Sequence, residues 1–244
     1  VLFLRRENST GGASDRLLCF SPRGSLLWNW QAGAQVKTAD GESLGTRYAI
    51  FQIVPWRTSA VHGVVAVARS AADFPTQVVL LDSGGRVLHT YWHAGHLNFN
   101  AVADLDHDGR PELWLGGTSN GYQRATLVAL DPEEMGGAFR EESTRHQIAG
   151  QSAPLEKARV LLYRTELSRI VAPFNTIGVL QAERDHLIAM TEEENPGSSP
   201  NASIVYSLGP GGEVTSASFA SYSIAYARDE ARLHDVVWLK RLGR

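Results

Sequence analysis

The sequence predicts an all-β protein, and three observations support this fold class. A phrase made of a strand, a small-residue turn and a second strand recurs along the chain. Apolar and polar residues alternate over many short runs, and few stretches keep a helical period over three turns. With 244 residues, 43% of them hydrophobic, the chain can bury a substantial core, and we expect one domain over residues 1–244.

The recurring phrase organises the chain. It is clearest at residues 17–30, where an apolar strand, the turn Ser-Pro-Arg-Gly-Ser and a Trp-containing strand follow one another. Residues 78–92 repeat it closely, residues 203–214 give it again, and residues 127–132 are a looser fourth copy. Hairpins that recur tens of residues apart indicate an array or a β-propeller.

These hairpins divide the chain into expected blades. The ranges are 47–93 (strands near 48–54, 62–69, 76–82 and 86–92), 97–139 and 170–219. The N-terminal strands, near 1–5, 16–20 and 26–30, are one short of a four-stranded blade. Strands within 222–238 are expected to complete that blade, which closes the ring and removes exposed edges. Because residues 145–169 are either a fifth blade or an insertion, we predict a β-propeller of four to five irregular blades.

Residues 104–112 read Asp-Leu-Asp-His-Asp-Gly-Arg-Pro-Glu and form an acidic turn between two expected strands. Calcium binds six to eight oxygens at about 2.3–2.6 Å, and alternate carboxylates in a short loop can surround one ion. Gly109 permits the sharp turn. Without a cation the loop crowds four negative charges together. The expected ligands are Asp104, Asp106, Asp108, the carbonyl of Arg110, and Glu112.

The surroundings of this loop resemble a known repeat. A strand over 97–103, the acidic turn, a second strand ending in Gly-Gly and a third strand over 125–131 resemble one repeat of the FG-GAP/VCBS family of β-propellers. In that family a D-x-D-x-D-G-x-x-D/E turn holds calcium between two strands of a blade. The resemblance implies the same ligands, Asp104, Asp106, Asp108, Arg110 and Glu112, around a structural calcium. Seven protein oxygens leave little room for a substrate, so we do not expect a catalytic ion.

Other residues offer alternatives. His93, His96 and His107 lie near the acids in sequence, which suggests a transition-metal site, although His107 holds a loop position that points away from the ion. Trp56 and Trp92 end strands and are candidate platforms for stacking a sugar. We favour calcium at the acidic loop and core packing for the tryptophans.

Composition limits the class of function. A net charge of −3 without a basic stripe argues against nucleic-acid binding, and no apolar run reaches the roughly 18 residues of a membrane span. Cys19 is the single cysteine, so no disulfide forms within the chain. The chain does not begin with Met and Val1 already belongs to a strand, which favours a domain excised from a larger protein.

We therefore predict a non-catalytic, calcium-stabilised module for ligand binding, sensing or protein interaction, with a carbohydrate or a protein as its partner. An extracytoplasmic location is expected because weak calcium modules work at the higher calcium concentrations found there. The alternative is a carbohydrate-active propeller, either a lectin or an enzyme similar to polysaccharide lyases or glycosidases. Such catalysis needs a carboxylate pair or a Lys/His base at a cleft, and the acids outside the loop are too scattered to nominate one.

Overall fold

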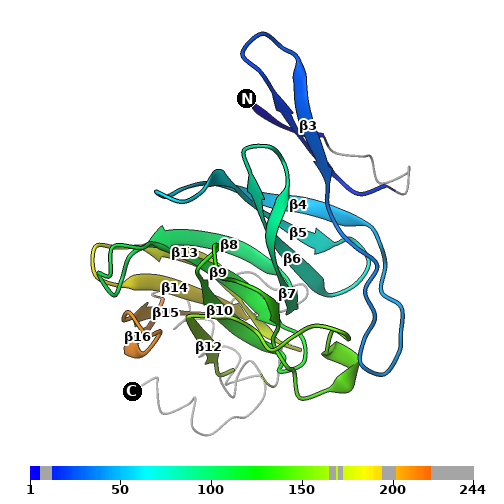
Figure 1. The fold of residues 1–244 in the computed structure, drawn as a ribbon. Helices are drawn as coiled ribbons and strands as arrows, with labels where there is room; N and C mark the ends of the chain where they lie inside the picture. The colour runs from blue at the N-terminus through cyan, green and yellow to red at the C-terminus, as the bar shows by residue number, and fades with distance from the viewer. Residues whose placement is uncertain (6–12, 165–168, 170–172, 194–201, 221–244) are drawn as a thin grey trace, which may run out of the picture. The chain divides into compact units, whose positions relative to one another are not determined.

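The structure is a computed structural model of residues 1–244, and it describes all of them except 6–12, 165–168, 170–172, 194–201 and 221–244 (Figure 1). Its described elements are β-strands and one 3-10 helix, η1 (Thr144–His146). The prediction of an all-β chain is confirmed. In the described part, no helix has the length and apolar character needed to cross a membrane.

The described strands form four sheets, none of which is closed. The first has the order β1-β2-β3, with β1 (Leu2–Arg5), β2 (Arg16–Phe20) and β3 (Leu26–Gln31). The second is an antiparallel meander of β4 (Tyr48–Arg57), β5 (His62–Ser70), β6 (Pro75–Asp82) and β7 (Val87–Ala94). The short strand β11 (Gly137–Ala138) pairs in parallel with β7 at its edge.

The other two sheets come from later parts of the chain. The third has the order β12-β10-β9-β8, with β8 (Leu97–Ala103), β9 (Glu112–Ser119), β10 (Arg124–Leu130) and β12 (Ala158–Leu162). The fourth is an antiparallel meander of β13 (Asn175–Ala182), β14 (Leu187–Glu193), β15 (Ala202–Leu208) and β16 (Val214–Phe219). The N-terminal strands and the four strands expected over 47–93 are confirmed to within a few residues.

The expected end of the blade over 97–139, which corresponds to the third sheet, was wrong. Its fourth strand is β12, which pairs antiparallel with β10, so the described part of residues 145–169 supplies a strand of this sheet and not a separate blade or an insertion. The physical reason lies at Asp131, whose carbonyl accepts the N–H of Met135 at 2.8 Å. That turn leads away from β10 instead of returning as a hairpin, and the chain reaches the edge of β10 only at Ala158. The strands expected within 222–238 lie outside the described residues.

The chain forms two compact units. The first comprises Val1–Asn98, Ser119–Tyr122 and Leu130–Glu156; the second comprises Phe99–Thr118, Gln123–Ala129 and Lys157–Arg244. Each has its own apolar core: Tyr48, Ile50 and Trp92 lie in the first, and Trp114, Leu127 and Ile177 lie in the second. The expectation of a single domain over 1–244 stays a prediction.

The recurring sequence phrase folds into the same hairpin turn in three sheets. In each turn the first residue donates its N–H to the carbonyl of the fifth, and the fourth donates to the carbonyl of the first, over residues 21–25, 82–86 and 209–213. The fourth residue is always a glycine with left-handed backbone, at φ 83° for Gly24, 79° for Gly85 and 81° for Gly212. Each hairpin also has a register shift just before the turn. The turn chemistry read from the sequence is therefore confirmed at atomic level.

Candidate metal site

The acidic loop connects β8 to β9, and its own aspartates hold it in shape. Oδ1 of Asp106 accepts the N–H of Asp108 at 3.1 Å, and Oδ1 of Asp108 accepts the N–H of Arg110 at 2.7 Å. Oδ2 of Asp104 reaches across the loop to the N–H of Gly109 at 2.9 Å. Asp side chains favour such bonds to the backbone two residues ahead, so the sequence itself specifies this turn.

Two residues of the loop have left-handed backbone. Gly109, at φ 85°, confirms the expected sharp turn. His107 adopts φ 59°, which is uncommon for a residue with a Cβ. Its Nε2 lies 3.6 Å from Oδ1 of Asp185, in the connection between β13 and β14, and both side chains are exposed. His107 therefore makes a contact of its own away from the acidic cluster.

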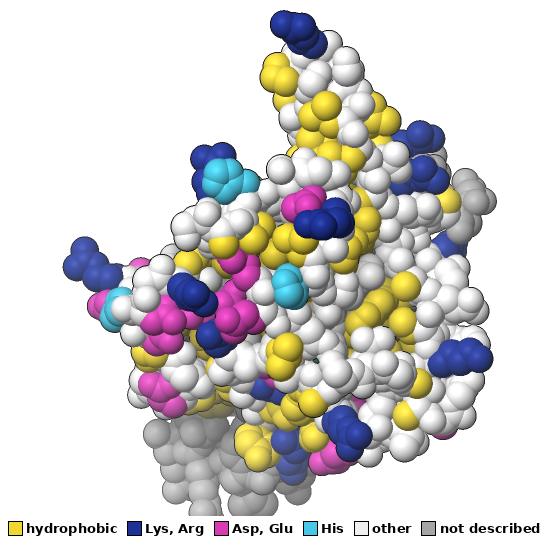
Figure 2. Space-filling model, viewed as in Figure 1, with side chains coloured by type: hydrophobic (Ala, Val, Ile, Leu, Met, Phe, Trp, Pro, Cys, Tyr) yellow, Lys and Arg dark blue, Asp and Glu magenta, His cyan; other side chains and the backbone are white. Residues whose placement is uncertain are grey.

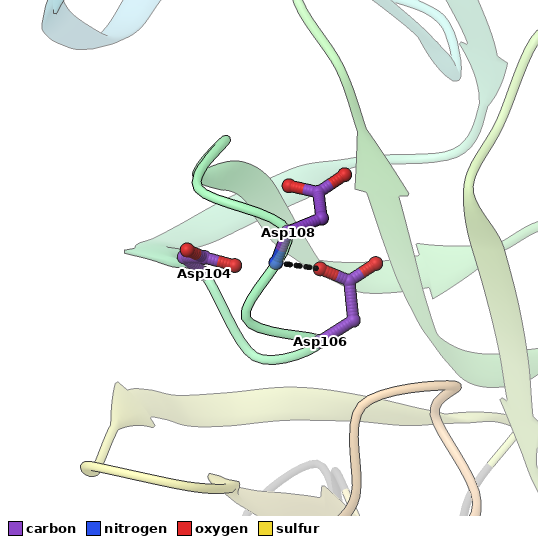
Figure 3. Close-up of side chains that lie close together, drawn as sticks. All are labelled: Asp104, Asp106 and Asp108. Atoms are coloured by element: carbon purple, nitrogen blue, oxygen red, sulfur yellow. Dashed lines mark hydrogen bonds between the residues drawn. The ribbon is translucent and has the colours of Figure 1, made fainter.

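The three aspartates form one cluster that can hold a metal ion (Figure 3). One carboxylate oxygen from each of Asp104, Asp106 and Asp108 lies within 4.8 Å of the others. Two oxygens bound to the same calcium at up to 2.6 Å are at most about 5.2 Å apart, so this spacing suits a single ion. Acidic side chains also gather at the molecular surface in Figure 2. Three carboxylates so close favour a cation that offsets their repulsion.

Two further observations fit a cation here. Oδ1 of Asp104 is buried and has no hydrogen-bond partner among the described residues. Glu112 opens β9 with only 6% of its surface exposed. Burial, helped by the charges of Asp106 and Asp108, raises the pKa of the Glu112 carboxyl, although a hydrogen bond from the backbone of Leu105 opposes this. A positive ion beside these groups would compensate both the buried oxygen and the crowded charge.

The expected ligands thus have different outcomes. Asp104, Asp106 and Asp108 come together in one cluster, as the sequence predicts. Glu112 is electrostatically coupled to two of them. Arg110 is exposed, and a role for its carbonyl stays a prediction, as does the choice of calcium over other cations.

The structure gives less support to the two alternatives, a transition-metal site with histidines and a tryptophan platform for a sugar. The described acidic cluster contains no histidine: His107 contacts Asp185, and Nε2 of His96 lies 3.1 Å from the carbonyl oxygen of Asp73. Trp92 lies in the first core with 4% of its surface exposed, and its ring centroid lies 6.0 Å from that of Tyr48, so it offers no face to a sugar. The idea of Trp92 as a stacking platform is therefore wrong.

Sequence reasoning missed a second feature, in the first unit. A cavity of about 370 Å³ is lined by side chains that include Cys19, Trp28 and Trp56. These residues come from β2, β3 and β4, so no local motif brings them together, although Trp56 by itself was a candidate stacking platform.

Comparison with known proteins gives no family for this chain: neither a protein-family model nor a curated protein sequence matches it.

Proposed function

We propose that this chain is a β-propeller module of the FG-GAP/VCBS type that uses a structural calcium at the β8–β9 loop. The observation that carries the proposal is the acidic cluster, in which oxygens of Asp104, Asp106 and Asp108 lie within 4.8 Å of one another. They do so in a D-x-D-x-D-G loop between two strands of one sheet, which is the setting the family resemblance implies.

The repeated hairpin turn supports the propeller architecture. In the second sheet this turn joins the third and fourth strands of the meander, β6 and β7. In the fourth sheet it joins the third and fourth strands, β15 and β16. In the first sheet the same turn joins β2 and β3. By this equivalence β1 corresponds to the second strand of a blade, and the strand that is lacking is the first one, which pairs with β1.

The missing strand comes, in this proposal, from the expected C-terminal strands within 222–238. Val1 and Phe20 each donate a backbone N–H to the other's carbonyl, at 2.8 Å in both directions. Hydrogen-bonded and non-hydrogen-bonded pairs alternate in an antiparallel ladder, so the backbone groups of Leu2 and Leu4 face the open edge of β1. A strand added there removes an edge that invites aggregation.

Backbone amide exchange tests this closure. In the full chain the amides of Leu2 and Leu4 should exchange slowly, and so should that of Phe3, which faces β2. A chain ending at Ala220 should lose protection at Leu2 and Leu4 and keep it at Phe3. Fast exchange of Leu2 and Leu4 in the full chain would contradict ring closure.

The site supports a structural ion. Each aspartate of the cluster also accepts a backbone N–H of its own loop, so the carboxylates have a folding task besides binding. A catalytic ion needs an open position for substrate, whereas a loop that surrounds its ion with protein oxygens leaves little space for one. The module then serves ligand binding, sensing or protein interaction outside the cytoplasm, where calcium is abundant. The carbohydrate-active alternative stays a prediction, tested by a glycan array and by depolymerisation of pectin-type polymers.

Thermal unfolding in calcium and in excess chelator tests the ion. Calcium at about 100 times its Kd should stabilise the fold by about 2.7 kcal/mol. Asp106→Ala should abolish this gain. Asp185→Ala is the matched control, because it removes a nearby exposed acid that is not in the cluster, and it should retain the gain. Identical melting curves of the unsubstituted chain in calcium and in chelator would refute the proposal.

A further inference from the structure

We propose that the cavity in the first unit binds a small planar aromatic carboxylate. This inference deepens the proposed function of a ligand-binding module by naming a ligand class. It involves none of the residues of the acidic loop.

The cavity has the size and lining of a small-ligand site. Its volume of about 370 Å³ is near the lower end of the roughly 300–1,000 Å³ typical of ligand pockets. Apolar side chains form most of the wall: Leu2, Cys19, Trp28, Pro55, Trp56 and Val64. Figure 2 also shows hydrophobic side chains exposed on the N-terminal strands. The wall therefore suits a flat, mainly apolar body.

Both indole rings are held in place without a ligand. Nε1 of Trp28 donates to the carbonyl of Ser83 at 2.9 Å. The ring of Trp28 also lies against the backbone of Gly85, where an added Cβ would come within 2.6 Å of it. Trp56 is 4% exposed, and its Nε1 donates to Oε1 of Glu133 at 3.3 Å. Because both rings are already ordered, little conformational entropy is lost when a ligand stacks on the half-buried Trp28 ring and packs against the exposed edge of Trp56.

The charges around the cavity select an anion. Asp82 is already compensated, since its Oδ2 lies 3.2 Å from Nε of Arg86 and its Oδ1 accepts two backbone N–H groups at 2.9 Å each. Arg57 also lines the cavity, and its guanidinium has no ion-pair or hydrogen-bond partner among the described residues. A guanidinium binds a carboxylate through two parallel N–H donors, so a carboxylate on the ligand matches the one uncompensated charge among the described lining residues.

Cys19 gives a direct measurement of occupancy. It is the single cysteine of the chain, its thiol is free, and it lines this cavity. A ligand in the cavity should therefore shield it from a thiol reagent. The rate of its reaction with a dithiobis-nitrobenzoate reagent can be followed in the full chain, with 1-naphthoate as the probe and 1-naphthylmethylammonium as the cationic counterpart of similar size.

We expect 1-naphthoate to slow the reaction saturably and the ammonium probe to have little effect. Arg57→Gln should weaken the protection by naphthoate about tenfold, since a charge-assisted hydrogen bond is lost. Arg23→Gln, which removes an exposed arginine from the β2–β3 turn of the same unit, should leave it unchanged.

Three results would overturn the proposal: no protection by naphthoate, equal protection by both probes, or equal weakening by Arg57→Gln and Arg23→Gln. The measurements are repeated in excess chelator. Suppose that naphthoate still protects Cys19 in chelator and that calcium does not change the melting curve. The calcium site would then be refuted and the ligand site would still be supported.

Discussion

The backbone N–H of Gly109 donates a 2.9 Å hydrogen bond to Oδ2 of Asp104, while Oδ1 of the same carboxylate is buried and has no hydrogen-bond partner among the described residues. One oxygen of Asp104 therefore builds the loop, and the other is available to a cation. Because different oxygens are involved, the contribution of Asp104 to folding can be separated from its contribution to metal binding.

Asp104→Asn should have opposite effects with and without metal. The amide oxygen can still accept the N–H of Gly109, so the loop keeps its shape. In chelator the variant should be more stable by roughly 0.2–1 kcal/mol, because one of several crowded negative charges is gone. In calcium it should be less stable than the unsubstituted chain, because a charged ligand is lost. Urea unfolding in both conditions measures the two signs, and a loss of stability in both would show that Asp104 acts only in folding.

Gly109→Ala should destabilise the chain by about 1–2 kcal/mol through backbone strain alone. The glycine has φ 85°, and no atom lies within 4 Å of an added Cβ, so no clash contributes. Gly109→Asn should cost less, because Asn tolerates the left-handed region. Gly136→Ala is the control: its backbone is outside that region, and its Cβ would meet only an ordinary contact at 3.6 Å. Urea unfolding should rank the variants in this order.

Gly85→Ala should be far more harmful than Gly24→Ala, although both glycines occupy the same turn position. Their φ angles of 79° and 83° carry the same strain. Only at Gly85 would the new Cβ meet the Trp28 ring, at 2.6 Å, whereas the space beside Gly24 is open. The overpacking should add about 1–3 kcal/mol to the strain.

A double-mutant cycle identifies the cause of that extra loss. If the Trp28 ring is responsible, Trp28→Leu should reduce the penalty of Gly85→Ala to that of Gly24→Ala. Additive losses in the cycle would contradict the contact between Trp28 and Gly85.

His96 should make the protein less stable in mild acid. Burial lowers the pKa of His96, and the charge of Arg69 adds to this, although the hydrogen bond with the carbonyl of Asp73 opposes it. The folded state then favours neutral imidazole, so between the folded pKa and the ordinary value near 6.5 the unfolded chain binds more protons. The contribution is fully present above about pH 6.5 and is lost as the pH falls through the folded pKa of His96.

Unfolding free energy measured from neutral to mildly acidic pH checks this sign. His96→Gln can still donate to the Asp73 carbonyl but does not titrate, so its pH slope should be shallower. Part of the slope should remain, because burial and the charge of Arg145 lower the pKa of His146 in the same direction. An unchanged slope in His96→Gln would contradict the assignment.

Local chemistry determined most of the strands and the acidic loop. The short apolar runs of β4 to β7 and the turns around Gly24, Gly85 and Gly212 depend on residues a few positions apart, so they can be read directly from the sequence. The same holds for the aspartates of the β8–β9 loop, whose side chains bond to backbone groups two to five residues ahead.

Tertiary structure alone decided what depends on residues far apart in the chain. The pairing of β12 with β10 requires closing a long connection, which no local propensity specifies. The burial of Glu112 depends on how its sheet is covered, although its position beside the loop is plain in the sequence. The cavity beside Cys19, Trp28 and Trp56 exists only because strands of two sheets, β1 to β3 and β4 to β6, meet there. That Arg57 lacks an ion-pair partner in the described part of the chain is known only once its neighbours in the fold are known. Short-range hydrogen bonding is encoded residue by residue, whereas burial and long-range pairing are properties of the whole folded chain.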